Sequence, residues 1–117
     1  MKKLYFAAVV AFATALANGA AAQDKLVYGA GMITCAEWQQ YRSSGNRPAI
    51  LQAQAWIDGY LSGSNASGNG PDFLMPKPSD IAYYAWIDNY CSQNPLNPLL
   101  QAVFLLKREL LSRAPSR

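Results

Sequence analysis

The octets AWIDGYLS (residues 55–62) and AWIDNYCS (residues 85–92) are identical at six of their eight positions. In each octet a tyrosine follows a tryptophan by four residues, and this spacing places both rings on one face of a helix. Large aromatic residues at helical spacing mostly belong to a protein core. We therefore expect helices whose core contains the aromatic residues Trp38, Trp56, Tyr60, Trp86 and Tyr90.

The two octets differ only at their fifth and seventh positions. The fifth position is Gly59 in the first octet and Asn89 in the second. A glycine lowers helix stability but allows another backbone to approach, so we expect a close helix contact at Gly59. The seventh position is Leu61, a typical core residue, in the first octet and Cys91 in the second. Cys91 is therefore the expected covalent anchor of its helix.

The N-terminus has the features of an export signal. Two lysines are followed by an apolar run and by three alanines that precede Gln23. This order predicts a secretory signal peptide over residues 1–22 and a single domain over residues 23–117. The apolar run is shorter than the roughly 20 residues that span a bilayer, so we expect no integral membrane segment after cleavage. Without the two lysines the formal net charge falls from +3 to about +1, and no basic cluster typical of nucleic-acid binding remains.

Cys35 and Cys91 are the only cysteines, and both belong to the exported part of the chain. In an oxidising compartment such as the periplasm, this pair predicts one disulfide. A zinc site would need further ligands, but the chain has no histidine and no CxxC motif. We predict no metal site and no cofactor.

Capping residues and prolines indicate where four helices begin. Thr34 and Glu37 have the spacing of a capping box, and Pro48 suits the first turn of a second helix. Ser79 can cap a third helix, and Asn97 can cap a fourth with the following proline at its first position. The sequence therefore predicts an all-α, four-helix domain with one disulfide and helices at about residues 35–43, 48–62, 80–93 and 98–113.

A long loop is predicted between the second and third helices, over residues 63–79. It is rich in glycine, serine, asparagine and proline, and Gly63 is expected to end the preceding helix. Loops of this length in compact domains are usually mobile or functional. Phe73, Leu74 and Met75 are apolar, which indicates that part of the loop packs against the helices. The loop is either a lid over the core or a partner-binding loop.

Asp58 and Asp88 occupy the same position in the two octets. Two carboxylates can divide acid and base roles when their surroundings separate their pKa values, which makes a small hydrolase one hypothesis. A serine or tyrosine nucleophile would lack its usual base, because the chain has neither a histidine nor an S-x-x-K motif. Solvated or helix-capping aspartates are the simpler interpretation, and we predict that the protein is not an enzyme.

The order of motifs resembles two groups of small exported proteins. The motifs are Cys-x-x-Trp at 35–38, W-x-x-G-Y-L-S-G at 56–63, W-x-x-x-Y-C at 86–91, Asn-Pro at 94–95, and an apolar last helix. This layout looks like that of the HdeA/HdeB acid-stress chaperones. It also looks like that of the Rap/Tai-type immunity proteins, which neutralise type VI secretion effectors in the periplasm. The HdeA-like resemblance implies a helical fold and maps Cys35 and Cys91 onto the disulfide of that family.

The resemblance implies a function in binding rather than catalysis. Our leading hypothesis is a periplasmic, HdeA-like protein that binds another polypeptide, as an envelope acid-stress chaperone does. Acid opening, as the family implies it, depends on many carboxylates that become neutral at low pH, and the seven in residues 23–117 are few for this role. The alternative is an immunity protein that neutralises a type VI effector. The expected partner is thus a client or a toxin, a homodimer is left open, and no nucleic acid is expected.

Overall fold

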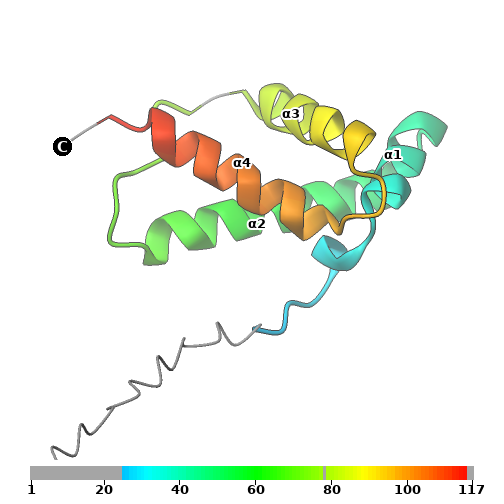
Figure 1. Cartoon of the computed structure of the whole chain (residues 1–117), viewed down its shortest axis with the longest axis horizontal. Helices are drawn as coiled ribbons and strands as arrows, with labels where there is room; N and C mark the ends of the chain where they lie inside the picture. The colour runs from blue at the N-terminus through cyan, green and yellow to red at the C-terminus, as the bar shows by residue number, and fades with distance from the viewer. Residues whose placement is uncertain (1–24, 78, 116–117) are drawn as a thin grey trace, which may run out of the picture.

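A computed structural model describes residues 25–77 and 79–115, and within them the chain is all-α, as predicted. Figure 1 shows α1 at one end of the domain, opposite the loop that joins α2 to α3. The predicted signal peptide, residues 1–22, lies outside the described residues. The elements are the 3-10 helix η1 (Ala30–Met32) and the α-helices α1 (Cys35–Ser44), α2 (Arg47–Ser67), α3 (Asp80–Gln93) and α4 (Leu99–Arg113).

The predicted capping box begins α1. The Thr34 hydroxyl accepts a hydrogen bond from the Glu37 backbone N–H at 3.1 Å, and the Glu37 carboxylate accepts one from the Thr34 backbone N–H at 2.7 Å. The helix ends at Gly45, which adopts the left-handed conformation with φ of 65°. Ser79 caps α3, also as predicted, by accepting a hydrogen bond from the Ala82 backbone N–H at 3.2 Å. Local sequence signals therefore fix both helix starts.

The beginning of α4 differs from our prediction. Pro98, not Asn97, is the N-cap residue, and no side chain caps the helix. The backbone N–H of Leu99 instead donates to the carbonyl of Ile33 at 2.8 Å. The Asn97 amide donates to the hydroxyl of Tyr90 at 2.7 Å, so this side chain supports α3. A tertiary contact thus replaces the expected local cap.

The end of α2 also differs, because the helix continues past Gly63 to Ser67. The Ser67 hydroxyl donates to the Gly63 carbonyl at 2.7 Å, and the Asn65 amide oxygen accepts from the Phe73 backbone N–H at 3.1 Å. One contact within the helix and one with the following loop therefore stabilise a turn that has low helix propensity. The loop spans residues 68–79, which is shorter than we predicted.

The octets contribute to the core through a different stripe from the one we expected. Ile57 and Leu61 in the first octet, and Ile87 and Cys91 in the second, are 0 to 2% exposed. Their four-residue spacing gives each helix one inward-facing stripe. Trp38 is fully buried as predicted, but the aromatic residues of the octets are only partly buried and stack at the edge of the core, in the pairs Trp56–Tyr60 and Trp86–Tyr90.

The predicted helix contact at Gly59 is wrong. This residue is exposed, and a Cβ atom built on it would meet nothing within 4 Å. The close approach occurs at Gly31 in η1, where a Cβ atom would lie 2.3 Å from the ring of Trp56. The indole N–H of Trp56 also donates to the carbonyl of Tyr28 at 2.9 Å. The segment before α1 is therefore held against α2 by Trp56.

The predicted disulfide joins Cys35, at the start of α1, to Cys91, near the end of α3. Both residues are fully buried, and their Cα atoms are 4.8 Å apart. The bridge spans a sequence separation of 56 residues. In the chain-entropy model, closing a loop of this size constrains the unfolded chain by about 4 kcal/mol. That amount is comparable with the net stability of a small domain.

Candidate functional site

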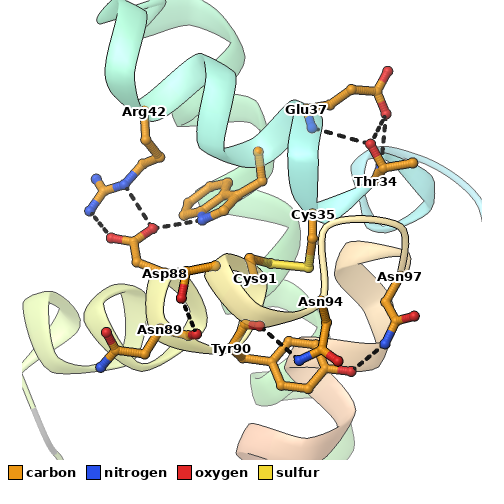
Figure 2. Close-up of a disulfide and its surroundings, with 12 residues drawn as sticks. Thr34, Cys35, Glu37, Arg42, Asp88, Asn89, Tyr90, Cys91, Asn94 and Asn97 are labelled. Carbon is orange, nitrogen blue, oxygen red and sulfur yellow. Dashed lines mark hydrogen bonds and ion pairs between the residues drawn. A yellow bond between two sulfur atoms is a disulfide. The ribbon is translucent and has the colours of Figure 1, made fainter.

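Asp88, from the second octet, links α3 to α1 beside the disulfide. Its Oδ1 atom accepts a hydrogen bond from the buried indole N–H of Trp38 at 2.7 Å. The Arg42 guanidinium donates to both carboxylate oxygens, at 3.2 Å and 2.7 Å, and lies over the ring of Trp38. Figure 2 shows the carboxylate of Asp88 facing the guanidinium of Arg42, with the Cys35–Cys91 disulfide to one side. One carboxylate thus accepts three hydrogen bonds from two side chains of α1.

Asp58, from the first octet, links α2 to α3. Its Oδ1 atom accepts a hydrogen bond from the hydroxyl of Tyr84 at 3.0 Å. Burial, and then this hydrogen bond to a carboxylate, raise the pKa of Tyr84 above its ordinary value. The ring of Tyr84 packs against Trp38 with centroids 6.4 Å apart. The repeated aspartate therefore has the same use in both octets, as an acceptor between helices.

These contacts bear on the hydrolase hypothesis. Asp58 and Asp88 accept from different groups, and no hydrogen bond joins them within the described residues. Paired acid and base catalysis needs two carboxylates that act on one reacting group. The structure shows interhelical contacts for both and does not bring them together in one hydrogen-bonded site.

All six carboxylates in residues 25–77 and 79–115 either accept a hydrogen bond or form an ion pair. Asp72 accepts from the Asn65 amide at 2.8 Å and from the Leu74 backbone N–H at 3.1 Å, so it joins the loop to α2. The hydrogen bonds from the Thr34 backbone and hydroxyl lower the pKa of Glu37. The six acceptors and their partners are Glu37 with Thr34, Asp58 with Tyr84, Asp72 with Asn65 and Leu74, Asp80 with Lys77, Asp88 with Trp38 and Arg42, and Glu109 with Arg113.

The predicted partner-binding residues of the loop lie in three different settings. Phe73 is buried in the core, Leu74 is partly buried, and Met75 is 61% exposed. The loop therefore packs against the helices, as predicted, and leaves one large apolar side chain at the surface. Met75 is among the residues that line two pockets.

The first of these, which we call the apolar pocket, has a volume of about 280 Å³. It lies between the loop, α3 and the C-terminal part of α4, with Glu109 and Arg113 among its lining residues. The apolar residues that line it include Phe73, Met75, Tyr83, Trp86, Leu106 and Leu110. Its surface suits an apolar side chain.

The second, which we call the acidic pocket, has a volume of about 420 Å³. It lies between the C-terminal part of α2, the loop and the start of α3. Its charged residues are three aspartates and one lysine, and its apolar lining includes Leu61, Leu74 and Met75. The four charged residues are Asp58, Asp72, Asp80 and Lys77.

Tyr83 lines both pockets and was not predicted as a site residue. It is 5% exposed, and its hydroxyl is buried without a hydrogen-bond partner. Burial raises its pKa, and the nearby charges of Asp80 and Asp58 raise it further. The spacing of Tyr83, Ile87 and Cys91 is a signal that could have identified it, because residues four apart share one helix face.

Comparison of the chain with family models, with curated proteins and with solved structures found no match. In the described part of the chain, no helix is both long and apolar enough to cross a membrane.

Proposed function

We propose that this is a periplasmic, HdeA-like protein that binds another polypeptide without catalysis and exposes its apolar core in acid. One observation carries the proposal: every carboxylate in residues 25–77 and 79–115 accepts a native contact, and three of them join separate elements. These three are Asp58, Asp72 and Asp88. The buried disulfide supports a location outside the cytoplasm, because such bonds persist in oxidising compartments.

Acid would weaken these contacts for a simple electrostatic reason. A neutral carboxyl group is a weaker acceptor than a carboxylate and no longer pairs with a cation. Arg42 would lose the charge of Asp88, and the remaining Lys and Arg side chains would repel one another. Proteins in this state keep helices but lose fixed packing and expose apolar surface. The disulfide would keep α1 joined to α3 while the other helices separate.

The test is suppression of client aggregation by the exported protein, purified with its disulfide formed. We expect it to suppress aggregation of an acid-sensitive enzyme between about pH 2 and 4, and not at neutral pH. The double substitution Asp58→Asn and Asp88→Asn should move the onset of activity to higher pH, because two interhelical acceptors are already uncharged.

The matched control is Asp80→Asn, whose carboxylate forms only an exposed pair with Lys77. It should leave the onset close to that of the native protein. The chaperone proposal fails if the native protein neither binds a dye for apolar surface nor suppresses aggregation across this acid range.

The immunity alternative is supported by the surface of the folded domain. Met75 is exposed between two pockets that exist without any opening of the core. A protein that blocks one toxin needs such a preformed surface at neutral pH. Affinity purification at neutral pH tests this role: recovery of one envelope hydrolase, lost with Met75→Asp, would favour it. A free protein with no stable partner would count against it.

A further inference from the structure

The acidic pocket contains carboxylate oxygens that the domain does not use. The contacts of its three aspartates all involve Oδ1, and in the described residues no protein group donates to Oδ2 of any of them. Formally three negative charges face one positive charge, that of Lys77. These spare acceptors belong to Asp58 on α2, Asp72 in the loop and Asp80 at the start of α3.

The Tyr83 hydroxyl is a second and independent sign of a ligand. A buried hydroxyl without a partner costs free energy, and most are satisfied by protein, water or a bound molecule. Asp58 and Asp80 both act on this hydroxyl electrostatically, and both line the acidic pocket but not the apolar one. Tyr83 lines the acidic pocket together with these two aspartates, and its hydroxyl is a neutral polar group that has no partner in the described residues.

We propose that the acidic pocket of the folded protein binds the side chain of a lysine from another polypeptide. An ammonium group is a compact cation with three donors, which suits carboxylate oxygens and a hydroxyl on different elements. The aliphatic stem would lie against Leu61, Leu74 and Met75.

Two observations favour an ammonium ion over other cations. Lys77 already places its own ammonium 3.4 Å from Asp80, at the exposed rim of the pocket. Among residues 25–77 and 79–115, no three His, Cys, Asp or Glu side chains are grouped closely enough to hold a metal ion. A polypeptide is the expected source, because Met75 joins this pocket to the apolar pocket. A bound chain can thus place a lysine in one pocket and an apolar residue in the other.

The test is a titration of the isotopically labelled protein at neutral pH, followed by backbone amide chemical shifts. The probes are acetyl-Ala-Lys-Ala-amide, the same peptide with norleucine, and free n-butylammonium. We expect shifts at the pocket residues with the lysine peptide, and none there with norleucine. Asp58→Asn should weaken binding about tenfold, since a bond to a charged group is lost, whereas Lys77→Gln should strengthen binding by removing a competing cation.

Tyr83→Phe gives a further check, because it should raise the stability of the free protein and lower its affinity for the lysine peptide. It removes a buried hydroxyl without a partner, so it should stabilise the free protein and weaken binding of the lysine peptide. Glu109→Gln, in the apolar pocket, is the control and should leave binding unchanged.

Equal binding of the norleucine peptide, or unchanged binding in Asp58→Asn, would overturn the site. Tighter binding of n-butylammonium than of the lysine peptide would show that the pocket prefers free amines. That result would overturn the claim that its ligand belongs to a polypeptide. The proposed lysine site belongs to the folded protein at neutral pH. A failure to bind the lysine peptide and a failure to suppress aggregation in acid are therefore separate results.

Discussion

The contact between Asp88 and Trp38 is expected to carry a large share of the stability of the domain. In Asp88→Ala, the Trp38 indole N–H loses its acceptor while the side chain remains fully buried. Leaving such a donor unsatisfied costs about 1–3 kcal/mol. The lost pair with Arg42 adds about 0.5–1 kcal/mol, because both side chains are roughly one-third exposed. The total destabilisation should be about 1.5–4 kcal/mol.

Asp88→Asn separates these two contributions. The asparagine oxygen can still accept from Trp38, but the negative charge that pairs with Arg42 is gone. We therefore expect a loss of only about 1 kcal/mol. Lys77→Ala is the control for an exposed ion pair and should change the free energy of unfolding by less than about 0.5 kcal/mol.

The assay is urea unfolding at neutral pH, with the disulfide intact and tryptophan fluorescence as the signal. The oxidised bridge then constrains native protein and variants alike. A loss below about 0.5 kcal/mol in Asp88→Ala, or equal losses in the alanine and asparagine variants, would refute the reasoning. Either result would mean that the hydrogen bond from the Trp38 indole to Asp88 adds no stability beyond that of the ion pair with Arg42.

Three further changes test other contacts. Gly31→Ala should destabilise the domain by about 1–3 kcal/mol because its Cβ would meet the ring of Trp56. Gly59→Ala should instead stabilise it by about 0.5–1 kcal/mol, and urea unfolding measures both. Tyr84 has a raised native pKa, so the native protein should lose stability as pH rises above about 10, and Tyr84→Phe should lose less in an alkaline titration. The native pKa of Glu37 is lowered, so the stability that its carboxylate contributes is present above its ordinary pKa of 4.5 and is lost as pH falls through the native pKa. The difference in unfolding free energy between the native protein and Glu37→Gln should therefore shrink over the same fall in pH.

The starts of α1 and α3 and the disulfide could be predicted because their signals are local or compositional. Thr34 and Glu37 contain the whole capping box, and two cysteines in a chain that we predict to be exported leave one intramolecular pairing. The ends of α2 and the start of α4 depend on contacts from distant segments. Asn65 binds the loop, and the carbonyl of Ile33 replaces the cap that we assigned to Asn97. No local pattern contains those partners.

The more deeply buried stripe of each octet was not predicted, because two stripes have the same period. Trp86 to Tyr90 and Ile87 to Cys91 are both four residues apart, and the larger aromatic rings seemed the better core. The predicted disulfide could have distinguished the two stripes. Cys91 must face α1 to form the bridge, and Ile87, four residues earlier on the same helix face, must then face inward as well. The pockets could not be predicted, since they depend on how loop residues 72–77 pack against α2, α3 and α4.

The central claim is that carboxylate contacts hold the apolar core closed and that acid releases it. The most direct measurement is an acid titration of the oxidised protein, followed by near-UV circular dichroism and by binding of a dye for apolar surface. We expect the near-UV signal of the buried Trp38 to disappear between about pH 4 and 2 while helical content remains and the dye binds. An unchanged near-UV signal and no dye binding down to about pH 2 would contradict the claim.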